Sequence, residues 1–263
     1  MYIKQKQLDN LGRALAPGKV VVIYGARRTG KTTLLQQFVR GVEEPYLLVN
    51  GEDITVQGYL ASQSIEKLSA FVGSNRLLVV DEAQKVPNIG ANLKLIVDHI
   101  QEMRVIATGS SSFDLARSIG EPLTGRKTTL KLFPLAQLEI GQIEERHQTD
   151  ANLESRLIYG AYPEVVLTND NRAREQYLRE IVASYLYKDV LEMDGIRHAA
   201  KISRLLQMIA LQVGKEVSYA ELGAGLGMSK NTIERYLDLL EKAFVIQKLS
   251  GFSRNLRSEI TKN

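Results

Sequence analysis

One octapeptide decides the fold of this chain: Gly25-Ala26-Arg27-Arg28-Thr29-Gly30-Lys31-Thr32, which has the spacing G-x-x-x-x-G-K-[ST] of a phosphate-binding loop (P-loop). The apolar run before it, residues 20–24, predicts a buried strand, and the residues after it predict a helix. A glycine-rich turn between a strand and a helix directs backbone N–H groups and the positive end of the helix dipole at one position. A phosphate group suits that position.

The residue types inside the loop suit the triphosphate of a nucleotide. Gly25 and Gly30 permit backbone torsions and close approaches that a side chain would prevent. Lys31 is expected to contact the β- and γ-phosphates, and the Thr32 hydroxyl to bind Mg²⁺. We therefore expect ATP, ADP and Mg²⁺ as ligands, and the expected nucleotide contacts are Gly25, Ala26, Arg27, Arg28, Thr29, Gly30, Lys31, Thr32 and Thr33.

The composition limits the alternatives. A chain of 263 residues can bury a core without disulfides or metals, and the absence of cysteine excludes a disulfide framework and thiolate zinc sites. The three histidines show no metal-ligand spacing. No apolar run approaches the length of a membrane span and no signal-peptide core is present, so we expect a soluble, cytoplasmic protein with no membrane partner. The net charge of +4 permits contact with nucleic acid without requiring it.

Strands and helices are predicted to alternate in the first part of the chain, which favours a three-layer α/β fold with a parallel sheet. The expected strands are residues 20–24, 46–49, 76–81, 104–108 and 127–133, with helices at 6–16, 64–72 and 93–103. Later segments, at 153–159, 171–193 and 199–213, are expected to be helical. We therefore predict a P-loop core over residues 1–148, an all-α lid or linker over 149–200 and a winged helix-turn-helix over 201–263.

A second motif completes the predicted phosphate site. The strand that ends Val79-Val80-Asp81-Glu82 would place two carboxylates at the carboxyl edge of the sheet, where α/β folds bind ligands. Asp81 is expected to support Mg²⁺, and Glu82 to orient and activate the attacking water. The alternative for Glu82 is an ordinary acidic residue at a helix start.

The next predicted strand ends in Thr108-Gly109-Ser110, which puts small hydroxyl groups at the same edge. Either Thr108 or Ser110 could bind the γ-phosphate or the water, and Ser110 joins Glu82 and Lys31 in the expected catalytic set. A helix N-cap explains these hydroxyl groups equally well.

In this order the motifs resemble those of the AAA-type ATPases with an additional strand and a catalytic glutamate. More narrowly, the chain is similar to the prokaryotic and archaeal ATPases that carry a winged helix behind the ATPase core. The narrower resemblance depends on the P-loop and on three further stretches, Gly125-Arg126, Leu132-Phe133-Pro134-Leu135 and Gly160-Ala161-Tyr162-Pro163. Ala161 departs from that family, which more often has a second glycine there.

The remaining candidate contacts are less specific. Arg126, after Gly125, is the first candidate to meet transition-state charge, in its own chain or on a neighbouring copy, although an arginine that orders its loop fits as well. Arg27 and Arg28 are expected to give electrostatic support or partner contacts. Pro163 is expected to line the adenine side, with a simple turn as the alternative.

The C-terminal residues predict a helix, a tight turn at Gly227 and a second helix whose N-cap is Ser229. The run 245–249 and the loop 251–255 are expected to form a strand and a wing. Glu234 and Asp238 share the outer helix face and would repel DNA phosphates, so the winged helix could also serve as an interdomain element. The expected nucleic-acid contacts are Lys230, Asn231, Arg235 and Arg254.

Together these features predict an ATP-hydrolysing AAA-type ATPase that couples nucleotide state to the position of its winged helix. Double-stranded DNA, a protein partner and a homo-oligomer all fit this interpretation. One alternative is a DNA-binding regulator that ATP switches with little hydrolysis, and a weaker one is a small-molecule kinase. The family that it resembles commonly continues into a domain similar to restriction endonucleases, so we expect this chain to be part of a longer protein.

Overall fold

The computed structural model describes residues 2–109, 123–184 and 199–249. Two compact units make up the chain, Met1–Val182 and Ala183–Asn263, and each is considered by itself. The predicted boundary after residue 148 lies inside the first unit. Within the described ranges, no helix combines the length and apolar character needed to cross a bilayer.

The first unit is built on a five-stranded sheet whose neighbouring strands are all parallel, in the order β2-β3-β4-β1-β5. This confirms the predicted parallel sheet. Strands β1, β3 and β4 are almost wholly buried, as expected for apolar runs covered on both faces. The strands are β1 (Val20–Tyr24), β2 (Tyr46–Asn50), β3 (Leu77–Asp81), β4 (Arg104–Gly109) and β5 (Lys127–Lys131).

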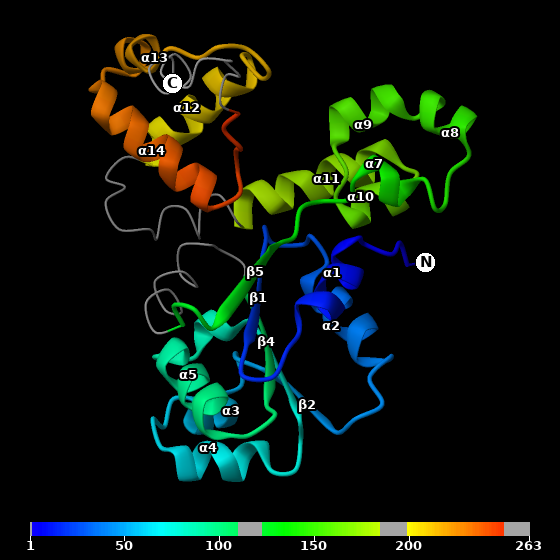
Figure 1. Ribbon diagram of the computed structural model, residues 1–263. Coiled ribbons are helices and arrows are strands. Elements are labelled where there is room, and N and C mark those ends of the chain that lie inside the picture. Colours follow the sequence, from blue (N-terminus) through cyan, green and yellow to red (C-terminus); the bar gives the residue numbers. More distant parts are fainter. Residues whose placement is uncertain (1, 110–122, 185–198, 250–263) are drawn as a thin grey trace, which may run out of the picture. The chain divides into compact units, whose positions relative to one another are not determined.

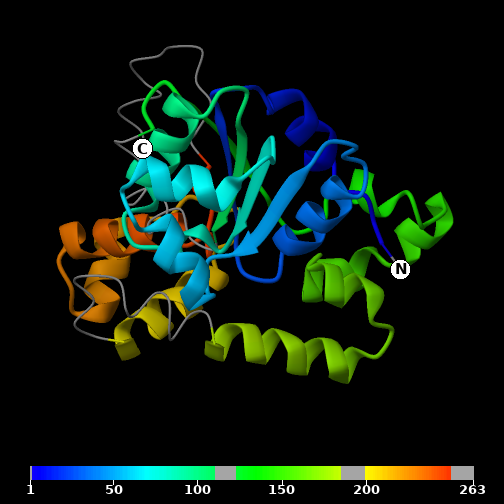
Figure 2. The ribbon, with the colours of Figure 1, turned by 90° about the horizontal axis from the view of Figure 1, so that it is seen from below.

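Helices cover both faces of the sheet, which gives the predicted three layers (Figures 1 and 2). One face packs on α1 and α2, where Leu11, Leu34 and Leu35 join Val21 and Ile23 in one buried cluster. The other face carries α3, α4 and α5. The bounds are α1 (Gln7–Ala14), α2 (Lys31–Val39), α3 (Ile54–Leu60), α4 (Ile65–Val72) and α5 (Ile89–His99), with a short 3-10 helix η1 (Ala83–Lys85) after β3.

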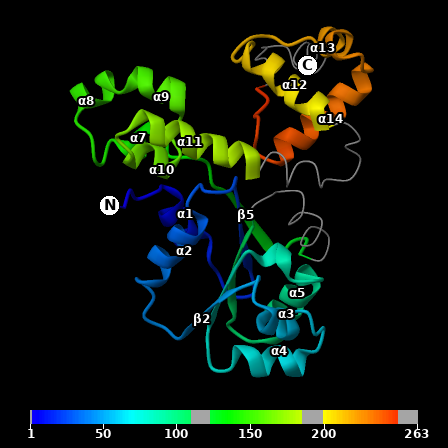
Figure 3. The ribbon, with the colours of Figure 1, turned by 180° about the vertical axis from the view of Figure 1, so that it is seen from behind.

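Short helices follow the last strand and gather beside one another (Figure 3). They belong to the first unit, and a small apolar cluster of Ile3, Leu135 and Ile140 ties them to the N-terminal segment. Residues 185–198, in which the predicted run 171–193 ends, lie outside the described ranges. The helices are α7 (Gln137–Ile140), α8 (Arg146–Ala151), α9 (Leu153–Tyr159), α10 (Pro163–Leu167) and α11 (Asn171–Ile181).

The second unit contains α12 (Ala199–Ala210), α13 (Tyr219–Leu226) and α14 (Lys230–Lys242). Helices α13 and α14 form the predicted pair: Gly227 adopts a left-handed turn, and the Ser229 side chain accepts from the Thr232 N–H group. The predicted strand over residues 245–249 was wrong, because these residues form no strand. The predicted wing over 251–255 lies outside the described residues.

Candidate active site

The P-loop follows the carboxyl end of β1 and enters α2 directly. A Cβ atom on Gly25 would overlap the carbonyl oxygen of Leu132, so the residue that follows β5 can pass this close to the start of the P-loop only because position 25 is a glycine. Gly30 has φ +95°, a left-handed conformation that also favours glycine. Because Gly30 is the N-cap of α2, no side chain at the cap competes with a ligand for the first N–H groups of the helix.

Lys31 lies inside this loop, with only 5% of its surface exposed. Its Nζ atom donates to the carbonyl oxygens of Gly25 at 2.9 Å and Ala26 at 2.8 Å. Burial lowers the pKa of the Lys31 ammonium to about 8, although the nearby carboxylates of Glu82 and Asp81 favour its charged form. The loop therefore holds a partly desolvated ammonium where the sequence predicts the phosphates.

Three oxygen groups meet at the carboxyl ends of β3 and β4 and at the start of α2. The Thr32 hydroxyl donates to Asp81 Oδ2 at 2.6 Å, and the Thr108 hydroxyl donates to Asp81 Oδ1. Strand β4 lies between β1 and β3, which is why residues far apart in sequence share this edge. Oxygen donors of this kind are the ligands that Mg²⁺ prefers, and Thr32 with Asp81 would hold the ion.

Glu82 follows Asp81 in a left-handed conformation, with φ +50°, which is unusual for a residue with a side chain. Its N–H group donates to Thr108 Oγ1 at 3.1 Å and to Asp81 Oδ1 at 3.2 Å. Its carboxylate accepts from the Gln84 side chain at 2.5 Å. The hydrogen bonds and the turn fix the direction in which the Glu82 side chain leaves the strand.

Residues from outside the two motifs also contact the P-loop. Gln5 is buried and donates from Nε2 to the carbonyl oxygen of Thr29 at 3.0 Å. Pro163, at the start of α10, comes within 3.9 Å of a Cβ atom built on Gly30, so it lies beside the loop. The guanidinium of Arg28 stacks over the Tyr177 ring of α11, 5.7 Å from its centre. Gln5, Gln84 and Tyr177 were absent from the sequence prediction.

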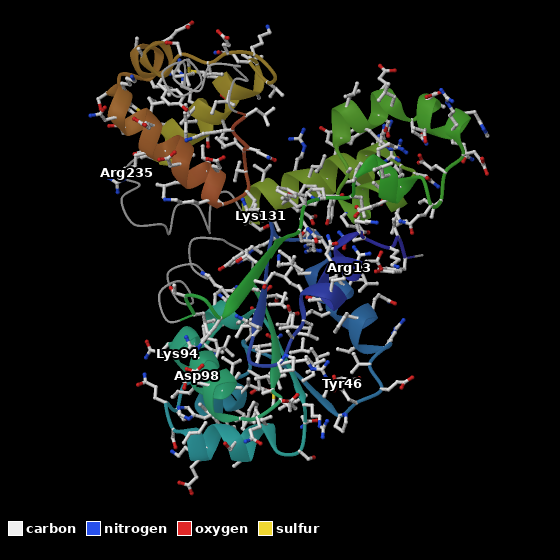
Figure 4. All side chains as sticks on the ribbon, viewed as in Figure 1. Arg13, Tyr46, Lys94, Asp98, Lys131 and Arg235 are labelled. Atoms are coloured by element: carbon white, nitrogen blue, oxygen red, sulfur yellow. The ribbon has the colours of Figure 1, made fainter. Side chains whose placement is uncertain are left out.

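One predicted catalytic residue, Arg126, lies away from the others, and a second, Ser110, cannot be compared with them. Arg126 precedes β5, and its carbonyl oxygen accepts from the N–H group of Val20 at the amino edge of the sheet, whereas the P-loop leaves the opposite edge. Its side chain forms an ion pair with Asp98 of α5. Figure 4 shows Asp98 far from Lys131, which marks the carboxyl end of β5. Within its own chain Arg126 therefore lies away from the P-loop, and Ser110 lies outside the described residues.

The second unit places three of the four predicted nucleic-acid residues on the exposed side of α14 or at its start. Lys230, Asn231 and Arg235 are exposed, while Ile233 and Tyr236 pack inward. Arg235 can be seen on the outer side of α14 (Figure 4). Asp238 forms an ion pair with Lys248, which offsets one of the charges that would repel phosphate. The fourth residue, Arg254, lies outside the described part of the chain.

Two family models match the chain in succession. Residues 17–141 match a model described as an AAA domain, and residues 150–263 match a model described as a domain of unknown function (DUF8612). The first match covers the whole sheet and both carboxylates of the candidate site. Together with the parallel sheet, it gives the first unit the core of an AAA-type P-loop ATPase.

Similar curated proteins are uncharacterized. The protein MJ1544 of Methanocaldococcus jannaschii is 27% identical over 91% of this chain and 58% of its own length. Rv2008c of Mycobacterium tuberculosis is 29% identical over 94% of this chain and 53% of its own length. This chain thus spans a little more than half of each relative. The solved structure of a RuvB variant from Thermotoga maritima is 18% identical, with a TM-score of 0.44, over 94% of this chain and 90% of that chain.

Proposed function

We propose that this chain binds ATP with Mg²⁺ at the P-loop and hydrolyses it to ADP and phosphate. The observation that supports this most is the meeting of the Thr32, Asp81 and Thr108 side chains beside the buried Lys31 ammonium. A phosphate-binding loop alone would explain the lysine. Metal-dependent phosphoryl transfer also needs a carboxylate beside the phosphates, and the hydrogen-bonded Asp81 carboxylate meets this need.

Each residue has a role that follows from its position. Backbone N–H groups of the loop and the Lys31 ammonium would bind the β- and γ-phosphates, and Thr32 with Asp81 would hold Mg²⁺. Mg²⁺ supplies positive charge that offsets the negative charge developing on the transferred phosphoryl group. Glu82 would accept a proton from the attacking water. The Thr108 hydroxyl group holds Glu82 and Asp81 in fixed positions relative to each other, because it hydrogen-bonds to both.

We infer that nucleotide state is passed on through the P-loop itself. Arg28 belongs to the loop and stacks on Tyr177 of α11. A shift of the loop on phosphate binding would therefore move α11 as well. Helix α11 ends at Ile181, and the second unit begins two residues later, at Ala183. Such a coupling would let ATP bias the position of the second unit, including the α13–α14 pair.

A test of nucleotide binding comes first. Wild type, Lys31→Ala and Lys94→Ala would be titrated with ATP and Mg²⁺ by calorimetry. Lys94 is an exposed lysine of α5 and serves as the control for loss of one positive charge. We expect Lys31→Ala to weaken binding roughly 10- to 100-fold, as for a lost charged hydrogen bond. Equal binding by Lys31→Ala and wild type would overturn the assignment of the site.

A DNA-binding regulator is the second candidate function. The exposed Lys230 and Asn231 at the start of α14 support it, because helix-turn-helix proteins contact base edges from the start of the second helix. A gel-shift titration at several salt concentrations, with and without ATP, tests it. No affinity for duplex DNA at low salt would rule this function out.

Arg126 would contribute to hydrolysis only at the nucleotide of a second copy of the chain. Its position at the amino edge of the sheet would let it approach the nucleotide of a neighbouring copy if the copies associate head to tail. Arg126→Ala would then lower turnover without changing ATP binding. Turnover that is linear in protein concentration and unaffected by Arg126→Ala would contradict this role.

A further inference from the structure

We propose that Gln5 is a positioning residue of the phosphate loop, and that it holds the Thr29–Gly30 peptide in the orientation that phosphate binding requires. The inference deepens the proposed function and rests on it, because it concerns the same loop. Gln5 lies before the first helix, outside both nucleotide motifs, and none of the family matches includes it.

The contact is a buried one. Gln5 is 4% exposed, and its Nε2 atom donates to the Thr29 carbonyl oxygen at 3.0 Å. The other end of the same amide also borders the loop, since a Cβ atom built on Gly30 would lie 3.3 Å from Gln5 Oε1. A buried side-chain amide needs such partners, and Gln5 finds this one in the backbone of the loop.

Peptide geometry turns this contact into a positioning role. In a trans peptide the C=O and N–H groups point in opposite directions. Because the Thr29 carbonyl is tied to Gln5, the N–H group of Gly30 must point away from Gln5. The Thr29 hydroxyl adds a second tie by donating to the Ala26 carbonyl at 2.9 Å. Gln5 thereby fixes one donor of the loop before any ligand arrives.

The segment that carries Gln5 is itself anchored on both sides. The Lys6 N–H group donates to Glu139 Oε1 at 2.6 Å, and the Gln142 side chain donates to the Lys4 carbonyl at 2.6 Å. Ile3 is buried in a cluster with Leu135 and Ile140. These contacts hold the segment against α7, so Gln5 presents its amide to the loop from a fixed support.

The test uses Gln5→Ala and the isosteric Gln5→Glu, which replaces the donor amide with a carboxylate. Gln7→Ala is the matched control, because Gln7 Nε2 also donates to a backbone carbonyl, that of Lys131 at 2.8 Å, but at an exposed site. Affinity would be measured by calorimetry for MgATP and for inorganic tripolyphosphate, which has no base or sugar. The melting temperature without ligand would be recorded for each variant.

We expect Gln5→Ala to weaken both MgATP and tripolyphosphate roughly tenfold, because a buried carbonyl loses its partner and the loop loses its preset orientation. Gln5→Glu should weaken both ligands further, since its carboxylate faces the Thr29 carbonyl and stands near the phosphates. Gln7→Ala should bind both ligands as wild type does. A folded Gln5→Glu keeps the test decisive if Gln5→Ala does not fold.

Three results would overturn the inference. Unchanged affinities with a lowered melting temperature would make Gln5 a purely structural residue. Weaker ATP binding with unchanged tripolyphosphate binding would make it a base contact. Tighter binding by either variant would mean that Gln5 restrains the loop. Failure of the proposed function is distinguishable, because there the wild-type protein itself would bind neither ligand.

Discussion

Lys31 is a charged residue in a nearly closed environment, and this has a consequence for pH dependence. Its pKa is lowered to about 8 by burial, from a usual value of 10.5. A triphosphate binds the ammonium form, which predominates below the lowered pKa and is lost as the pH rises through it. Binding of ATP should therefore take up a proton at high pH and weaken.

We predict that the dissociation constant for MgATP is about tenfold higher at pH 9 than at pH 7, as linkage to a single group with this pKa requires. Calorimetry across that range would measure it. Lys31→Arg is the control, because its guanidinium stays charged at every pH used. A dissociation constant that does not change with pH in wild type would show that the Lys31 pKa is not lowered.

Thr108 offers a second prediction, since its hydroxyl both donates to Asp81 and accepts from the Glu82 N–H group. Thr108→Val keeps the shape but removes both bonds. We expect at least a tenfold lower turnover, nearly unchanged ATP affinity and a loss of about 1–2 kcal/mol in the free energy of unfolding. Thr128→Val, at an exposed position of β5, is the control. Normal turnover in Thr108→Val would remove Thr108 from the site.

Sequence motifs predicted the site residues that lie within one loop or directly after one strand. Lys31, Thr32, Asp81 and Glu82 follow buried strands that a parallel sheet brings to one edge. Gln5 and Tyr177 were not predictable in this way. Gln5 reaches Thr29 from 24 residues away, and such contacts depend on how helices pack, which no local pattern encodes.

A substitution at Gly25 tests how closely the chain passes where β1 and β5 end. Gly25→Ala would place a Cβ atom on the Leu132 carbonyl, so the end of β5 must move. We predict a lower melting temperature and loss of ATP binding. Gly58→Ala, inside α3 with nothing within 4 Å of its Cβ position, should instead stabilise the protein by about 0.5–1 kcal/mol. Equal effects of the two substitutions would contradict the described packing.

The strands could be predicted from apolar runs, whereas the ends of the helices were harder to predict. The predicted helix over residues 93–103 begins earlier, at Ile89, and ends at His99. An extended Ile100 and a left-handed Glu102 end this helix and lead into β4. Because this turn contains no glycine, the sequence does not show where the helix ends. The run 245–249 has strand composition, but the structure shows no strand at these residues.

The first unit carries the P-loop, and the second unit carries the α13–α14 pair. If α14 contacts duplex DNA, Lys230→Ala should lower the affinity and reduce the slope of log K against log salt by about 1. Lys215→Ala, at an exposed loop of the same unit, is the control. Fluorescence anisotropy over a range of salt concentrations measures both. An unchanged slope in Lys230→Ala would exclude a phosphate contact at that position.

The central claim is that this chain hydrolyses ATP with Glu82 as the residue that activates the water. A measurement of phosphate release tests it most directly. Wild type, Glu82→Gln and the exposed control Glu66→Gln would be assayed with MgATP, with and without duplex DNA, beside a measurement of ATP binding. We predict Mg²⁺-dependent release by wild type and Glu66→Gln, and about a 100-fold or greater loss in Glu82→Gln with nearly unchanged binding. Release by Glu82→Gln at the wild-type rate would contradict the account.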